Sequence, residues 1–432
     1  MMELIDRLDM QREALRLYLA GSPVALFAFL ATLAAVIFWV SARPGLQRFF
    51  RFFPALIWMY FLPMLCSSVG LIPHESPLYG FMVSPILPVI IVLLLLPSDP
   101  ATIARVGPKG IAMMLIGTLG IVAGAAGSIA LFLYFLPAGT LPPDLWKGVA
   151  ALSGSWIGGS PNMAAIAASV SLEPTLFGKM VVVDTVCAYT WLGVLIALVG
   201  WQARLDRFNR ADGCLVEQLA SRLALQQAER SRPIHTPDVL AILGIGFAVS
   251  QLCLFVGESL GSTVSRAEQA GGVLATLRLS QVLSGFGWGI LLTTAAGIAL
   301  SFTSLRKLDD AGASSLGNAG LYLLLTTFGA QADLRLIGRE DAWLFAIGAV
   351  WLLIHIAILF VGARLLRAPL FLVATGSMAN VGGTASAPVV AAAFHPSLAP
   401  VGLLLAILGG IIGTPIGLLV VGKLCAALAE TG

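Results

Sequence analysis

The stretch Gly154-Ser-Trp-Ile-Gly-Gly-Ser-Pro-Asn-Met163 interrupts an apolar run with Gly, Ser, Pro and Asn where a membrane helix would be expected. A second stretch, Gly376-Ser-Met-Ala-Asn-Val-Gly-Gly-Thr-Ala-Ser-Ala-Pro388, does the same near the other end of the chain. A bilayer offers no water to exposed backbone N–H and C=O groups, so such a break is tolerated only inside protein or beside a hydrated cavity. Two breaks in matching places of two halves are typical of a transporter binding site.

The composition predicts an all-α, polytopic integral membrane protein. The chain has 432 residues, of which 58% are hydrophobic and 11% are charged, and its mean hydropathy is +0.93. Soluble domains carry about 25% charged residues. The repeated apolar runs are long enough to cross about 30 Å of hydrocarbon, so the lipid bilayer is an expected partner. The net charge of +3 gives no reason to expect a nucleic-acid partner.

Sequence motifs give no indication of an enzyme. The five cysteines and four histidines are scattered and show no metal-ligand spacing. A nucleophile elbow, a Walker motif, an HExxH pair and a dinucleotide fingerprint are all missing from the sequence. We therefore expect no catalytic residues, no cofactor and no ATP-driven step.

The chain divides into two apolar halves joined by a polar segment. We expect an amphipathic segment at residues 1–22, a first transmembrane repeat at 23–200, a hydrophilic linker at 201–237 and a second repeat at 238–432. The first segment is expected to lie along the membrane surface, and the linker to hold an amphipathic helix around Cys214–Gln227. Expected spans are 23–40, 53–72, 78–96, 111–135, 148–170, 177–200, 238–256, 282–302, 319–332, 342–365, 371–394 and 398–424.

The loop charges indicate that the two halves are inverted repeats. Positive residues such as Arg105, Lys109, Arg306 and Lys307 mark cytoplasmic loops, so the two broken spans would run in opposite directions. A count of twelve spans, six in each half, would instead make the halves parallel. We therefore expect one crossing to be missed or overcounted, around Glu258–Gln281, and predict about 11–13 transmembrane helices.

Asp184 is the strongest single candidate for ion coupling. It lies inside the apolar run of the 177–200 span, where a charged side chain costs at least about 2.5 kcal/mol. Such a carboxyl group is suited to reversible proton binding, and a bound Na⁺ would stabilise its charged form. The alternative is a structural carboxylate that hydrogen-bonds the broken helices.

The breaks supply hydroxyl, amide and backbone groups that could hold a solute or Na⁺, the one metal ion we expect there. The alternative is a pair of kinked packing helices without a ligand. Gln331 and Asp333 are secondary candidates, with a solvated helix end as their alternative. The candidate binding residues at the breaks are Ser155, Gly158, Gly159, Ser160, Pro161, Asn162, Thr375, Asn380, Gly382, Gly383, Thr384 and Ser386.

Several motifs resemble one known family. SWIGGSPNMAAIAAS, VVVDT, FGAQADL and ANVGGTASAPVVAAA occur in this order in a chain that is similar to the family called domain of unknown function 819 (YjcL-like). The resemblance implies a distant relationship to the cation/proton antiporter and bile-acid symporter superfamily. It further implies a core domain with two crossing discontinuous helices, a mobile panel domain, and Asp184 on the helix that bears the antiporters' ion-binding carboxylate.

The hypothesis from sequence is a secondary active transporter of the bacterial inner (plasma) membrane, with the possibility of a homodimer left open. It would carry a small solute, an organic anion rather than a large hydrophobe, coupled to H⁺ or Na⁺ by alternating access. Two alternatives remain open: a non-transporting membrane sensor or scaffold, and a passive channel.

Overall fold

The computed structural model describes residues 2–46, 49–50, 55–98, 104, 106–135, 141–142, 144–211, 235–271, 279–281, 283–336, 338, 341–395 and 398–431. Throughout these residues every regular element is a helix, which confirms the all-α prediction. Seven helices within them are long and apolar enough to cross a membrane, which confirms a polytopic protein. The amphipathic helix expected around Cys214–Gln227 lies outside the described residues.

The described residues of the first half form α-helices that range from five to 28 residues in length. α5 passes into α6 through the π-helical turn Met82–Ile86, which contains Pro85, and Pro88 follows in the first turn of α6. Both prolines lack the N–H donor that a regular α-helix needs. In chain order the helices are α1 (Met2–Gly21), α2 (Pro23–Ser41), α4 (Ala55–Ser68), α5 (Pro77–Phe81), α6 (Leu87–Leu95), α8 (Pro108–Phe135), α9 (Leu145–Gly158), α10 (Ser160–Ser169), α11 (Pro174–Leu198) and α12 (Gln202–Asn209).

The second half of the chain is also built from helices. α14 is one continuous helix up to Gln269, so the described part of 258–281 contains no additional crossing. The helices are α14 (Thr236–Gln269), α16 (Gly285–Ser301), α17 (Ala313–Gln331), α18 (Ala342–Leu366), α19 (Leu370–Val381), α20 (Gly383–Phe394), α21 (Ala399–Ile416) and α22 (Lys423–Thr431).

Each broken stretch is a helical hairpin, which corrects the prediction of discontinuous helices that cross the membrane. A Cβ atom on Gly154 would lie 3.0 Å from the backbone carbonyl carbon of Asn162, so α10 runs back along α9. The rings of Phe371 and Phe394, at the open ends of α19 and α20, have centroids 5.8 Å apart. In one straight helix these two residues would be roughly 34 Å apart. Arms of 10–14 residues reach roughly 15–21 Å, short of the hydrocarbon thickness.

The hairpins bear on the conflict noted in the sequence, where the loop charges indicate inverted halves but twelve spans would make the halves parallel. The expected 11–13 transmembrane helices counted both broken stretches as crossings. Without them, the described residues of each half contain five candidate crossing elements, α2, α4, α5–α6, α8 and α11 against α14, α16, α17, α18 and α21. An odd number of crossings in the first half would give the second half the opposite orientation. In agreement, α8 and α18 pack antiparallel, since Gly117 lies against His355 and Gly124 against Trp351. The inverted repeat itself stays a prediction.

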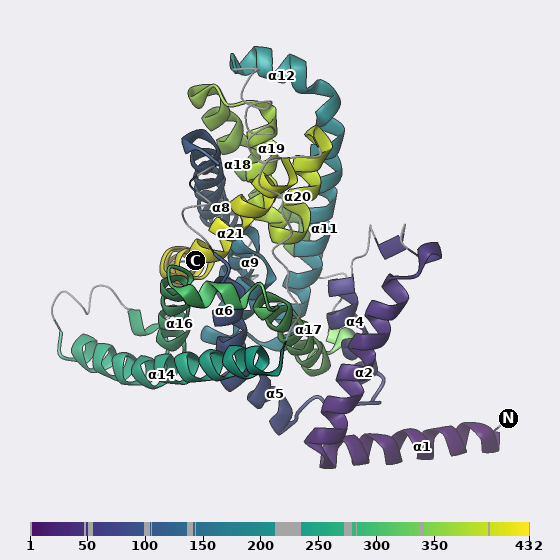
Figure 1. Ribbon diagram of the computed structural model, residues 1–432. Helices are drawn as coiled ribbons and strands as arrows, with labels where there is room; N and C mark the ends of the chain where they lie inside the picture. The colour runs from purple at the N-terminus through teal and green to yellow at the C-terminus, as the bar shows by residue number, and fades with distance from the viewer. Residues whose placement is uncertain are drawn as a thin grey trace.

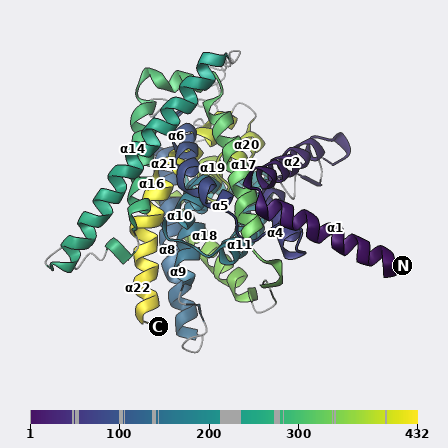
Figure 2. The same ribbon diagram turned by 90° about the horizontal axis from the view of Figure 1, so that it is seen from below.

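The helices form two groups that meet along one boundary (Figures 1 and 2). The core group contains α8, α9, α10, α11, α18, α19, α20 and α21, and the panel group contains α2, α4, α6, α14, α16 and α17. In Figure 1 most of the core group is in the upper part of the molecule and the panel group in the lower part. α1 extends from the edge of the panel group, with the N-terminus at its far end.

Glycines allow a very close helix contact between α14 and α16 of the panel group. A Cβ atom on Gly257 of α14 would lie 2.3 Å from the backbone nitrogen of Gly289 of α16. One turn further along, a Cβ atom on Gly261 would lie 2.7 Å from the Cα atom of Gly285. Small residues at four-residue spacing let membrane helices approach this closely. The α14–α16 pair therefore depends on having no side chains at these positions.

We predict that Gly257→Val destabilises the protein by about 1–3 kcal/mol, because the side chain must push α14 and α16 apart. Gly244→Val is the matched control, since it makes the same change in the same helix where nothing lies within 4 Å of a Cβ atom. Thermal unfolding of both variants in detergent measures the difference. Equal unfolding midpoints for the two variants would contradict the close packing.

Candidate functional site

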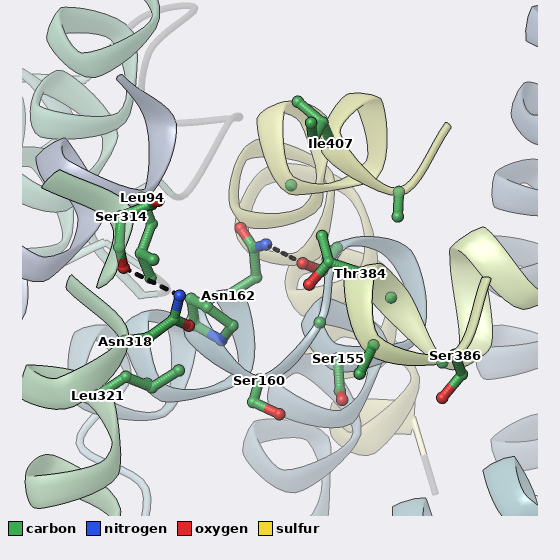
Figure 3. Close-up of a pocket in the computed structure, with 18 of the residues that line it drawn as sticks. Leu94, Ser155, Ser160, Asn162, Ser314, Asn318, Leu321, Thr384, Ser386 and Ile407 are labelled. Carbon is green, nitrogen blue, oxygen red and sulfur yellow. Dashed lines mark hydrogen bonds between the residues drawn. The ribbon is translucent and has the colours of Figure 1, made fainter. Parts of the chain in front are cut away.

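A cavity of about 550 Å³ lies between the core and panel groups. Both hairpin tips, α11 and α21 line it from the core group, and α4, α6 and α17 line it from the panel group. In Figure 3, Ser314, Asn318 and Leu321 of α17 lie across from Thr384 and Ser386 of α20. Predicted residues that line the cavity are Ser155, Gly158, Gly159, Ser160, Pro161, Asn162, Asp184, Gly382, Gly383, Thr384 and Ser386.

The two hairpin tips touch each other at the cavity. Gly159 and Gly383 both have positive φ, at 89° and 61°, a backbone conformation that favours glycine. A Cβ atom on Gly383 would lie 3.4 Å from the Cα atom of Gly159. α21 packs closely against the first tip, because a Cβ atom on Gly409 would lie 2.1 Å from the carbonyl oxygen of Ile157. The breaks that lie far apart in sequence therefore form one site.

Asp184 reaches the first tip from α11 and is held there by two donors. The Ser155 hydroxyl donates to Oδ2 at 2.7 Å, and the Trp156 indole N–H donates to Oδ1 at 2.9 Å. Trp156 is fully buried, and its ring lies 4.8 Å from that of Trp351, centroid to centroid. The Trp351 indole N–H in turn donates to the Ile121 carbonyl at 2.7 Å. The carboxyl group is thus fixed in position while still lining the cavity.

Asn162 replaces backbone hydrogen bonds that the first break removes. Its Nδ2 donates to the Gly158 carbonyl at 2.8 Å, at the end of α9. Its Oδ1 accepts from the Thr414 backbone N–H at 3.0 Å and from the Thr414 hydroxyl at 2.5 Å. This side chain therefore ties the tip to α21.

Thr375 and Asn380 lie behind the cavity rather than on its wall. Both side chains are completely buried, and the Asn380 Nδ2 donates to the Thr118 hydroxyl of α8 at 3.0 Å. Nearby, the Ser377 hydroxyl is hydrogen-bonded to Trp191 at 2.8 Å and to His355 at 2.9 Å. These contacts hold α19 against α8, α11 and α18, and they give Asn380 a structural role.

Gln331 and Asp333 are not among the residues that line the cavity. The Gln331 amide donates to the Thr327 carbonyl of its own helix at 3.0 Å. Asp333 accepts from the Arg335 guanidinium at 2.8 Å, and this hydrogen-bonded pair lowers the pKa of the Asp333 carboxyl to about 2. Both residues occupy the end of α17 away from the cavity.

The cavity also has polar lining residues that the sequence analysis did not single out, most of them on its panel side. Ser314, Asn318 and Tyr322 line it from α17, Tyr189 lines it from α11, and Asp309 lines it from the loop before α17. Asp309 Oδ1 accepts the Ser314 backbone N–H at 3.0 Å. Polar residues at positions i, i+4 and i+8 of one apolar helix are a signal that could have identified the α17 stripe.

The boundary between the groups is closed at the end away from Asp309. Tyr60 of α4 is buried, and its hydroxyl donates to the Pro174 carbonyl at the start of α11 at 3.0 Å. A Cβ atom on Gly178 would lie 2.1 Å from that hydroxyl oxygen. The rings of Phe177 of α11 and Phe328 of α17 lie 4.7 Å apart, centroid to centroid. We call Tyr60, Pro174, Phe177, Gly178 and Phe328 the aromatic seal.

We predict that Gly159→Ala costs about 1–3 kcal/mol of stability, because φ 89° and ψ 178° form a backbone conformation essentially restricted to glycine. Gly410→Ala is the control: Gly410 also lines the cavity, and a Cβ atom there would have only the Gly158 oxygen nearby, at 3.9 Å. Thermal unfolding measures both variants. A Gly159→Ala protein as stable as Gly410→Ala would contradict the hairpin geometry.

Comparison with known proteins places this arrangement in a family. The sequence profile of a family described as "Protein of unknown function (DUF819)" matches residues 28–427. A relative described as "Uncharacterized membrane protein YjcL", from Bacillus subtilis (strain 168), is 24% identical over 393 residues. That alignment covers 88% of this chain and 92% of the relative. Neither description states a substrate.

Proposed function

The chain belongs to the DUF819 family of proteins of unknown function, and from this premise we propose that it is a secondary active transporter of a small solute. It would work by alternating access in the bacterial inner (plasma) membrane, coupled to an ion through Asp184. Transport in this proposal needs no cofactor and no catalytic residue.

The observation that carries the proposal is the meeting of both hairpin tips and Asp184 at one cavity. A sensor or scaffold would not need the two breaks to converge on a cavity. In such a protein we would expect the breaks to be packed against other helices and closed to water. Helix ends, hydroxyl groups and carboxyl groups around a cavity at the interface of two repeats are typical of transporters. The site therefore favours transport over a structural role.

The aromatic seal favours a transporter over a passive channel. The cavity is lined by the first part of α17, whereas Phe328 near the end of α17 belongs to the seal. The loop at Asp309 follows Arg306 and Lys307, which mark the cytoplasmic side by the positive-inside rule. The structure thus matches a state that is open inward and closed outward, and a channel would need both ends open together.

We propose that the two halves form inverted repeats, with the core group moving against the panel group. Inverted repeats would also account for an outward-open state. If the two halves exchange conformations, the cavity opens to the opposite side of the membrane. Hydrogen bonds link the two groups among the described residues. They include the Tyr60–Pro174 hydrogen bond and a hydrogen bond from the Ser284 hydroxyl to the Ser169 carbonyl at 3.2 Å.

The donors around Asp184 suit proton coupling. The Ser155 hydroxyl can donate to a carboxylate, and after rotation it can accept a hydrogen bond from a protonated carboxyl group. The Trp156 N–H can donate to the other oxygen in both states. Asp184 can therefore gain and lose a proton without losing its hydrogen bonds, and Na⁺ is the alternative coupling ion that the experiment below distinguishes.

We predict that Asp184→Asn abolishes ion-coupled flux, because the amide cannot exchange a proton. Purified protein is reconstituted into vesicles with an imposed pH or Na⁺ gradient, and dissipation of the gradient is followed with an internal dye as solutes are added. Wild-type vesicles should respond to a transported solute, and Asp184→Asn vesicles should match empty liposomes.

Asp144→Asn is the control, since it removes an exposed carboxylate that pairs with Lys147 at the surface. This variant should retain wild-type flux. Full coupled flux by Asp184→Asn would overturn the proposal, and a response to the Na⁺ gradient alone would identify Na⁺ as the coupling ion.

We predict that Tyr60→Phe shifts the protein toward an outward-open state. Loss of one buried hydrogen bond costs about 1 kcal/mol, which is about fivefold in an equilibrium. Ser160→Cys on the first hairpin tip is labelled with an impermeant thiol reagent from the side of the aromatic seal. Labelling should rise about fivefold when Tyr60→Phe is added.

The matched control is Tyr79→Phe, because Tyr79 is also buried and its hydroxyl also donates to a proline carbonyl, that of Pro73 at 2.7 Å. This bond joins α5 to the loop just before it and does not join the two groups. Equal labelling in the two tyrosine variants would show that the aromatic seal does not control access.

A further inference from the structure

The wall of the cavity is acidic. Asp184 and Asp309 both line it, and among the described lining residues there is no Lys, Arg or His. The remaining polar groups are hydroxyls and amides, which accept as readily as they donate. The side chains of the cavity therefore offer negative charge and no positive charge to a solute.

The helix ends at the two tips do not reverse this balance. A helix N-terminus carries roughly +0.5 charge and a C-terminus roughly −0.5. Each hairpin tip has one of each, since α9 and α19 end there and α10 and α20 begin there. The Asn162 backbone N–H, at the start of α10, is already bonded to the Gly159 carbonyl at 3.0 Å. The paired ends largely cancel, so the carboxyl groups set the sign of the site.

The rest of the wall suits an apolar stem and a cationic head. Tyr189 and Tyr322 bring aromatic rings to the cavity, and the face of such a ring attracts a cation. Leu94, Leu321 and Ile407 add an apolar surface on the sides of the cavity. A volume of about 550 Å³ is within the range of small-molecule sites.

We infer that the solute is a small organic cation, an ammonium ion on a short apolar stem, whose charge lies against Asp184. This inference rests on the proposed transport function and names its substrate class. It departs from the organic anion expected from sequence, because a buried anion beside Asp184 would have no cationic side chain to offset its charge. Only the arrangement of the cavity wall reveals this, since the lining residues come from distant parts of the chain.

The test compares three solutes that share a butyl stem and carry a positive, a negative or no charge: butyltrimethylammonium, butanesulfonate and butanol. Thermal unfolding of the full chain in detergent is measured at increasing solute concentration. The ammonium ion should raise the unfolding midpoint by about 2 °C or more at saturation, and the sulfonate and the alcohol should not. Asp184→Asn should remove this rise, and Asp144→Asn, on the surface, should keep it.

A vesicle assay separates this inference from the proposed function. Because both ions are permanently charged, neither crosses the bilayer as a weak acid or base. The ammonium ion should drive Asp184-dependent gradient dissipation, and the sulfonate should not. Flux of the sulfonate instead would overturn the substrate class and leave the transporter standing. A rise in midpoint that survives Asp184→Asn, or no rise with the ammonium ion, would also overturn the inference, and gradients that no solute dissipates would count against the proposed function.

Discussion

Backbone groups inside a bilayer have no water to hydrogen-bond, so they must find partners within the protein. In this protein the constraint is strongest at the two hairpin tips, where the helices end and the tips contact each other. Asn162 bonds the last turn of α9 and the backbone of α21, so one side chain supplies partners on both sides of the break. Gly159 and Gly383 bring the tips within van der Waals distance. Each tip shields the other, and the cavity forms beside them.

Close packing makes the core group a firm support for these tips. On α8, Gly117 and Gly124 leave room for His355 and Trp351 of α18, and Trp351 then supports the indole of Trp156. The position of Asp184 thus depends on a series of contacts that begins at the α8–α18 interface. Contacts between the two groups are of another kind, made at the seal by aromatic rings and single hydrogen bonds. In the proposed cycle, this boundary is where the two groups would move relative to each other.

The polar residues of the site divide by role once their contacts are known. Asp184, Ser155 and Trp156 form a fixed unit that lines the cavity. Asn380, by contrast, is used in packing α19 on α8. The α17 side chains across the cavity from the hairpin tips belong to the panel group, so the proposed solute site would be shared between the two groups that move relative to each other in the proposed cycle.

The sequence by itself determined the class of protein, the two breaks, Asp184 and most of the residues on the hairpin tips. Composition and the cost of polar groups in lipid are local properties, and they can be read along the chain. The tertiary structure decided that the breaks are turns of hairpins, because Phe371 and Phe394 meet only when α20 folds back. It also decided which polar residues face the cavity: the α17 stripe of Ser314, Asn318 and Tyr322 does, and Asn380 does not. A side chain's neighbours across a helix interface depend on the packing of distant segments, which no local pattern contains.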